Sequence, residues 1–438
     1  MTRLLLCCLC LLGLLPAAQA QTPLYFPPAG TTWASTSPQS LGWCQPQLDT
    51  LLAYLGRQHT KGFIVLKDGR LVVEQYYGTF TRDSLWYWAS AGKSLTGTLV
   101  GIARQDGLLS LSDSVSRFLG RGWTAAPPAK ERLITVRHLL SMSSGLDDTP
   151  PLPCDNESTT AACLLYQVDA GTRWAYHTGA YRKLQPLLAQ ASGLTLNQYT
   201  NQKIGSVIGM GGAWVNDVYY SRTRDMARFG LLMLARGKWN GTPVLRDTAY
   251  FRQMTTPSQG LNRSYGYLWW LNGQASHMLP QTQLVFPGAI TPTAPPDMIA
   301  ALGKNDQKIY VVPSQGLVVV RTGQSAGQSH LALSSFDTEL WRRLMAAVQC
   351  RPTAGAASAP LADFAAFPVP AAEVLTVQLP ASPAATLRLT DALGRPVQQQ
   401  PATPPRQQLM LQGLAAGVYF LQLLDEKGNI LATRRVLH

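Results

Sequence analysis

The stretch WYWASAGKSLTG, from Trp86 to Gly97, places a serine and a lysine three residues apart, Ser90 and Lys93. Apolar residues at helical spacing follow as far as Gly107, which predicts a helix that begins at Ser90. Side chains three residues apart lie on one face of a helix. The sequence therefore predicts a hydroxyl beside an amine at a helix N-terminus.

This pair has the chemistry of an activated nucleophile. A serine hydroxyl attacks a carbonyl only when a neighbouring group takes its proton, and a neutral Lys93 amine can do so. Burial and the positive end of the helix dipole both favour the neutral amine. The free N–H of Ser90 can also hold an oxyanion, worth roughly 3 kcal/mol per donor. The alternative is a capping serine with an unrelated lysine.

Composition narrows the class of protein. The 438 residues are 46% hydrophobic and 14% charged, which predicts a packed globular protein. The net charge is +13, but the basic residues are scattered, so we expect no nucleic-acid binding.

The first twenty residues predict a signal peptide rather than part of the fold. They combine a short positive start, an apolar run from Leu4 to Leu15, and small residues before Gln21. Since no later run has the ~18 apolar residues of a spanning helix, we expect no integral membrane protein. The sequence thus predicts a secreted or cell-surface protein that passes through the periplasm.

Four cysteines follow the predicted signal peptide: Cys44, Cys154, Cys163 and Cys350. An even number in an exported chain favours disulfides, and three pairings are possible. A bond from Cys154 to Cys163 would close a short loop, and one from Cys44 to Cys350 would join the ends of a domain. Their spacing does not fit a zinc site, and unpaired buried thiols are the alternative.

The chain predicts two domains. Residues 21–350 hold strands near both ends and helices between them, which indicates one α+β domain. Residues 351–363 are dominated by Ala and Pro and predict a linker. Residues 364–438 hold short alternating runs separated by turns, which predicts a small all-β sandwich.

A second segment, AGTRWAYHTGAY at residues 170–181, holds Tyr176. A phenol near a lysine can shuttle protons, because a positive charge stabilises phenolate. We therefore add Tyr176 to the candidate catalytic residues.

Four ordered motifs, WASAGKSLTGTLVGIA, ITVRHLLSMSSGL, GTRWAYHTG and SRTRDMARFGLLMLARGKWNG, resemble the class C β-lactamase and penicillin-binding-protein-like serine hydrolases. The closer resemblance is to their 6-aminohexanoate-dimer hydrolase branch. It implies an antiparallel sheet flanked by helices, plus an all-helical subdomain. It implies Ser90 as acylated nucleophile, Lys93 as activator and Tyr176 as general base or acid, with no metal or cofactor. It also implies antiparallel first and last helices, and so a Cys44–Cys350 disulfide.

Two motifs depart from the family. Its usual Tyr-x-Asn is here Tyr176-His177-Thr178, so we expect Thr178 and His177 to contact substrate. Its usual Lys-Thr-Gly has its nearest equivalent at Lys304-Asn305-Asp306, with Lys304 and Gln307 as further substrate-binding candidates. We expect Asp306 to bring negative charge close to the acyl pocket, which favours an amidase or esterase over a carboxylate-recognising β-lactamase.

The C-terminal domain resembles the sorting domains of the type IX secretion system, in FPVPAAEVLTVQL, DALGRPV and LAAGVYFLQL. The resemblances together predict a secreted serine hydrolase that cleaves a small amide, ester or peptide-like substrate through a Ser90 acyl-enzyme. Two alternatives remain: a β-lactamase or D-alanyl-D-alanine peptidase, and a non-catalytic binder of cell-wall peptide.

Overall fold

The structure is a computed structural model that describes residues 23–30, 32–327, 333–350, 364–379, 386–391, 394–426, 428 and 430–438. The predicted signal peptide and linker lie outside these residues. The chain divides into two compact units at residue 350.

The first unit is built on a six-stranded antiparallel sheet in the order β2-β1-β13-β12-β11-β8. Its strands are β1 (Thr60–Lys67), β2 (Arg70–Tyr76), β8 (Trp270–Leu271), β11 (Ile299–Gly303), β12 (Gln307–Val312) and β13 (Leu317–Gly323). Strands β1 and β2 form a hairpin whose turn holds Asp68 and Gly69. The first and last parts of this unit meet in the sheet, because β1 pairs with β13.

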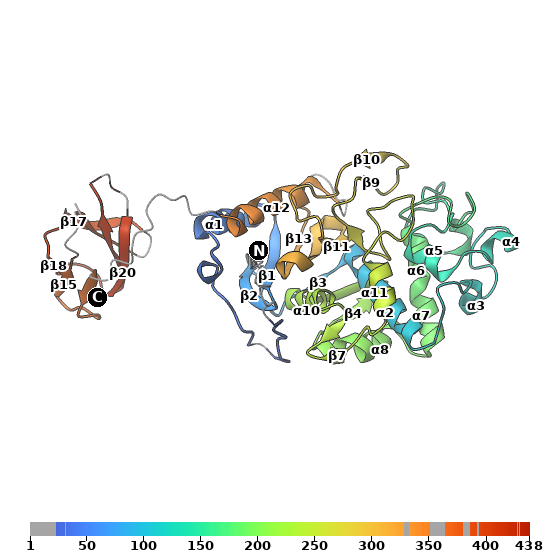
Figure 1. Ribbon diagram of the computed structural model, residues 1–438, viewed down its shortest axis with the longest axis horizontal. Coiled ribbons are helices and arrows are strands. Elements are labelled where there is room, and N and C mark those ends of the chain that lie inside the picture. Colours follow the sequence, from blue (N-terminus) through green and yellow to red (C-terminus); the bar gives the residue numbers. More distant parts are fainter. Residues whose placement is uncertain are drawn as a thin grey trace, which may run out of the picture. The chain divides into compact units, whose positions relative to one another are not determined.

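Helices cover both faces of the sheet (Figure 1). On β12, Tyr310 packs edge-on against Trp341 of α12 (Ser335–Val348). The adjacent Ile309 faces Gly230 of α10 (Thr223–Leu234). Since successive strand residues point to opposite faces, α12 and α10 lie on opposite sides of the sheet.

Helix α1 (Gln45–Arg57) runs antiparallel beside α12. Cys44 caps α1, and its N–H donates to the carbonyl of Ala347. Cys44 and Cys350 form the predicted disulfide, with their Cα atoms 5.7 Å apart.

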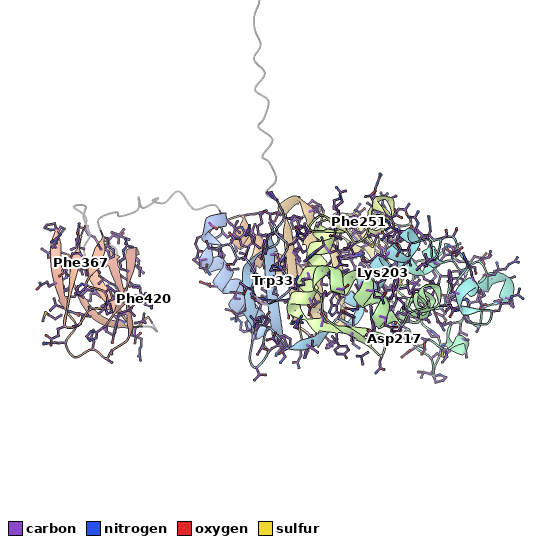
Figure 2. The ribbon with its side chains drawn as sticks, turned by 90° about the horizontal axis from the view of Figure 1, so that it is seen from below. Trp33, Lys203, Asp217, Phe251, Phe367 and Phe420 are labelled. Carbon is purple, nitrogen blue, oxygen red and sulfur yellow. A yellow bond between two sulfur atoms is a disulfide. The ribbon has the colours of Figure 1, made fainter. Side chains whose placement is uncertain are left out.

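The helical part of the unit lies between residues 92 and 208. It contains α2 (Gly92–Gln105), α3 (Ser116–Leu119), α4 (Pro128–Glu131), α5 (Val136–Leu140), α6 (Thr178–Arg182), α7 (Leu184–Ser192), α8 (Leu196–Thr200) and α9 (Ser206–Ile208). Almost every residue of α2 is buried, because α2 packs between this region and the sheet. A single apolar core runs through both parts and includes Trp33, labelled in Figure 2.

Small elements complete the first unit. A three-stranded sheet pairs β3 (Leu85–Tyr87) with β5 (Val218–Arg222) and β5 with β4 (Ala213–Val215). The others are β6 (Lys238–Trp239), β7 (Thr242–Pro243), α11 (Thr248–Met254), β9 (Ser276–Met278) and β10 (Val285–Pro287).

The second unit is all β, as predicted. One sheet has the order β14-β15-β18 and the other β17-β16-β19-β20. The strands are β14 (Ala365–Phe367), β15 (Val374–Gln378), β16 (Thr386–Thr390), β17 (Pro396–Pro401), β18 (Arg406–Met410), β19 (Val418–Leu424) and β20 (Ile430–Leu437). Alternate residues of β15, β16 and β19 form its separate core. None of the described helices in either unit is both long and apolar enough to cross a membrane.

Candidate active site

Ser90 lies in a short turn, Ala89–Ala91, between β3 and α2. The buried Trp88 anchors this turn: its backbone N–H donates to the carbonyl of Tyr219 (2.8 Å) and its indole N–H to the hydroxyl of Ser221 (2.7 Å). Ala89 then takes a left-handed conformation, with φ at 48°, which is uncommon for a residue with a Cβ. The chain thus presents the Ser90 side chain to the first turn of α2.

Lys93 joins two segments of the site. Its Nζ donates to Ser90 Oγ (2.9 Å) and to Thr178 Oγ1 (3.3 Å). It also lies over the rings of Tyr176 and Tyr181, 4.9 and 4.6 Å from their centroids. Among the described residues no acidic side chain forms an ion pair with it.

These surroundings favour a neutral amine. Lys93 is only 2% exposed, and its pKa falls from 10.5 to about 7, chiefly because of burial. The positive charge of Arg182 contributes to this lowering of the pKa, whereas Glu157 opposes it. A substantial fraction of Lys93 is therefore neutral near pH 7 and able to accept a proton.

Tyr176 completes the cluster from the loop that precedes α6. Its phenol is a hydrogen-bond partner of Ser90, and its ring stacks on Trp270 with centroids 5.9 Å apart. Burial raises the pKa of Tyr176 well above its ordinary value, and the hydrogen bond with Ser90 opposes that rise only in part. The phenol therefore keeps its proton at neutral pH, whereas Lys93 is partly deprotonated there.

Thr178 and His177 take different positions. Thr178 accepts the hydrogen bond from Lys93 and so belongs to the cluster. His177 instead caps α6, where its Nδ1 accepts from the N–H of Ala180. The His177 side chain is buried, and burial lowers its pKa. Its ring nitrogen contacts Asn156 and Ala180 rather than Ser90 or Lys93.

Lys304 lies on the turn between β11 and β12, and Gln307 is the first residue of β12. The Lys304 side chain is exposed. Gln307 is fully buried. Its side-chain amide donates to the carbonyl of Gly323 (2.6 Å) and accepts from the N–H of Gly323 (3.1 Å). The Gln307 side chain thus ties β12 to the end of β13 rather than facing Ser90.

The expected negative charge of Asp306 beside the acyl pocket is wrong. Its carboxylate accepts from Ser334 Oγ (2.8 Å) and the N–H of Ala326 (2.9 Å), and it pairs with the buried Lys308 (3.2 Å). Asn305 and Asp306 both have positive φ, at 58° and 60°, so the tight turn directs the carboxylate into this buried ionic cluster. The charge stabilises the turn instead of lining the site.

Two residues at the site, Gly303 and Asn156, were not predicted from the sequence. Gly303 ends β11 so close to the Ser90 turn that a Cβ there would lie 2.3 Å from the carbonyl oxygen of Trp88. The strand end therefore lies directly beside the nucleophile turn. Asn156 donates to the carbonyl of Tyr176 and accepts from the N–H of Thr178, although only a cysteine two residues away marks its loop.

The described residues contain no group of three or more His, Cys, Asp or Glu placed to hold a metal ion. The cluster of Ser90, Lys93, Tyr176 and Thr178 can itself move protons: a hydroxyl contacts both an amine that is partly neutral and a phenol that stays protonated.

Comparisons with known proteins agree with this architecture. The sorting-domain family, described as a secretion system C-terminal sorting domain, matches residues 365–436. An uncharacterized protein of Alkalihalophilus pseudofirmus is 21% identical over 306 residues, which cover 60% of this chain and 83% of that protein. A putative 6-aminohexanoate-dimer hydrolase from Bacillus anthracis has a TM-score of 0.57 and 18% identity, covering 75% of this chain and 90% of that one. A putative β-lactamase from Bacteroides dorei has a TM-score of 0.56 and 17% identity, and the match covers 70% of this chain and 100% of that one.

The sorting domain points to export by the type IX secretion system, and so to a secreted or cell-surface location. The family described as Beta-lactamase matches residues 51–334, well over half of the chain. Its members are generally serine hydrolases. The chain is a member of the β-lactamase family with a C-terminal sorting domain.

Proposed function

We propose that this protein is a secreted serine hydrolase that cleaves a small amide or ester through an acyl-enzyme on Ser90. One observation carries the proposal: a buried amine with a pKa of about 7 lies 2.9 Å from a serine hydroxyl at the start of a helix. A serine next to such an amine is an activated nucleophile.

The proton steps follow from the two pKa shifts. Neutral Lys93 takes the proton of Ser90 as Oγ bonds to the substrate carbonyl carbon. The protonated Tyr176 donates to the leaving amine or alkoxide as the carbonyl–heteroatom bond breaks. Acylation thus leaves Lys93 as a cation and Tyr176 as a phenolate. The phenolate then takes a proton from the water molecule that attacks the acyl carbon, and Lys93 returns its proton to Ser90 Oγ as the acyl–Oγ bond breaks and the acid is released.

The oxyanion of the intermediate needs backbone donors. We assign one to the N–H of Ser90 and the other to the end of β11, which approaches the Ser90 turn as closely as a glycine permits. Neither role requires the side chain of Gln307, and the exposed Lys304 remains available for substrate.

An amide or ester fits this site better than a β-lactam or a stem peptide. The turn after β11 carries Asn305 where the family pattern has Thr, and its Lys304 is exposed, so the usual carboxylate-binding pair is incomplete. The similarity to a putative 6-aminohexanoate-dimer hydrolase is consistent with this preference. We also propose that residues 1–20 are removed as a signal peptide, which N-terminal sequencing of the exported protein would test.

The test is intact-mass detection of a covalent adduct after reaction with a fluorophosphonate. We expect one adduct per chain, absent in Ser90→Ala, and labelling that slows about tenfold per pH unit below about 7. A panel of p-nitrophenyl esters, anilides and nitrocefin then ranks the substrate classes. The absence of any adduct would favour a non-catalytic binder, and preferred hydrolysis of nitrocefin would favour a β-lactamase.

A further inference from the structure

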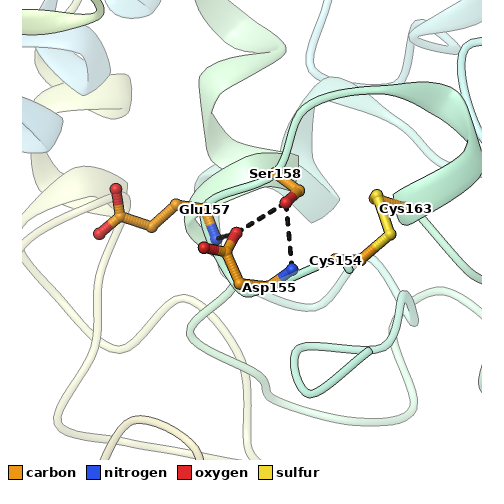
Figure 3. Close-up of a disulfide and its surroundings, with 5 residues drawn as sticks. All are labelled: Cys154, Asp155, Glu157, Ser158 and Cys163. Atoms are coloured by element: carbon orange, nitrogen blue, oxygen red, sulfur yellow. Dashed lines mark hydrogen bonds between the residues drawn. A yellow bond between two sulfur atoms is a disulfide. The ribbon is translucent and has the colours of Figure 1, made fainter. Parts of the chain in front are cut away.

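A disulfide-closed loop lies against the segment that carries Tyr176. Cys154 and Cys163 are bonded, with Cα atoms 5.4 Å apart (Figure 3). Inside the loop, Ser158 Oγ donates to Asp155 Oδ1 (2.7 Å) and accepts from the N–H of Asp155 (3.1 Å). The N–H of Glu157 donates to the same carboxylate (3.0 Å). The disulfide and these bonds make the loop a small fixed unit.

The side chain of Asn156 links this loop to the backbone of the site. Its Nδ2 donates to the carbonyl of Tyr176 (3.0 Å) and to that of Asp148 (2.9 Å). Its Oδ1 accepts from the N–H of Thr178 (3.0 Å). The Asn156 side chain therefore holds the backbone on both sides of His177. The two residues that it holds, Tyr176 and Thr178, are those whose side chains contact Ser90 and Lys93.

The loop also holds α6 by its backbone and at its far end. The N–H of Gly179 donates to the carbonyl of Asn156 (2.8 Å), and a Cβ on Gly179 would lie 2.0 Å from the carbonyl oxygen of Ser158. Arg182, the last residue of α6, pairs with Glu157 (3.0 Å). The helix is thus fixed at both ends by one ten-residue loop.

We propose that Asn156 is a positioning residue for this site, and that the Cys154–Cys163 disulfide keeps Asn156 in place. The inference rests on the proposed function. Tyr176 lies in a loop and Thr178 opens the short helix α6, so no long helix or strand holds them and their backbone needs external support. Displacement of a catalytic group by about 1 Å can slow a reaction about a hundredfold. A disulfide limits the conformations that the loop can sample.

The first test replaces the amide in the full-length oxidised protein. For Asn156→Ala, we expect kcat for a p-nitrophenyl ester to fall at least tenfold while KM changes less than threefold, after correction for active sites titrated with fluorophosphonate. The matched control is Asn197→Ala, whose amide donates to the carbonyl of Trp214 (3.2 Å) and accepts from its N–H (2.7 Å) in the same manner. We expect that control to keep kcat within twofold.

The second test removes the disulfide. Cys154→Ser/Cys163→Ser should also lower kcat at least threefold, whereas Cys44→Ser/Cys350→Ser should lower the melting temperature and leave kcat per titrated site unchanged. A wild-type kcat in Asn156→Ala would overturn the positioning role. A wild-type kcat in Cys154→Ser/Cys163→Ser would overturn the role of the disulfide, and this variant decides the proposal if Asn156→Ala does not fold. Failure of the wild-type protein to label at all would instead overturn the proposed function.

Discussion

Replacing Lys93 with methionine should make the protein more stable at pH 7 while abolishing acylation. The pKa of Lys93 falls from 10.5 to about 7 because its charge is buried without an acidic partner. One pKa unit corresponds to about 1.4 kcal/mol, so the shift of roughly 3.5 units represents about 5 kcal/mol of unfavourable free energy for the charged form. Methionine fills a similar volume without that penalty.

The difference in stability between Lys93→Met and the wild type depends on pH. Between pH 7 and about 10.5 the unfolded chain binds a proton at Lys93 that the folded chain does not, so wild-type stability rises with pH in this window. The lowered pKa of Lys93 reduces the stability of the wild-type protein by about 4 kcal/mol at pH 7 and by about 1 kcal/mol at pH 10. The variant also loses the hydrogen bonds to Ser90 and Thr178, which lowers its free energy of unfolding by about 2 kcal/mol at either pH. The variant should therefore be more stable by about 2 kcal/mol at pH 7 and less stable at pH 10.

The assay is urea unfolding followed by tryptophan fluorescence at pH 7, 8, 9 and 10. Comparing variant with wild type at each pH cancels the titration of the other groups. The matched control is Lys304→Met, at an exposed lysine, where we expect the free energy of unfolding to change by no more than about 0.5 kcal/mol. A difference for Lys93→Met that stays constant from pH 7 to pH 10 would refute the account of a neutral, buried amine.

Three further changes test other parts of the site and fold. Tyr176→Phe keeps the stacked ring and removes the proton donor, so acylation measured by stopped flow should slow by about 10²–10⁴-fold with little change in melting temperature. Gly303→Ala puts a Cβ 2.3 Å from the Trp88 carbonyl oxygen and should lower both stability, by about 1–3 kcal/mol, and the rate of fluorophosphonate labelling. Wild-type labelling of Gly303→Ala would show that the strand end does not support the nucleophile turn. Cys44→Ser/Cys350→Ser opens a link between residues 306 apart and should cost about 4 kcal/mol in denaturant unfolding, without slowing acylation.

The sequence was most informative where local pattern and chemistry coincide. The spacing of Ser90 and Lys93 predicts their contact, because two residues on one helical turn meet whatever the rest of the chain does. The Cys44–Cys350 pairing followed from the family's helix order, and the alternating runs of the second unit predicted its sheets.

Side-chain direction in turns was not predictable in this way. Motif position placed Lys304, Asp306 and Gln307 together beside the substrate. Two consecutive residues with positive φ reverse the chain there and turn Asp306 and Gln307 into the protein. Backbone conformation of this kind depends on the buried partners, here Lys308 and the end of β13, which lie elsewhere in the sequence.

The sequence also could not predict which of Lys93 and Tyr176 acts as the base and which as the acid, because these roles depend on burial rather than on residue type. A cationic lysine beside a phenol would favour phenolate, and the tyrosine would then be the base. Here burial acts on both groups in opposite directions, lowering the pKa of Lys93 and raising that of Tyr176. Each group is favoured in its neutral form, so the amine accepts a proton and the phenol donates one. A carboxylate brought beside Lys93 would raise the pKa of Lys93, and Ser90 would then lose the neutral amine that serves as its base near pH 7.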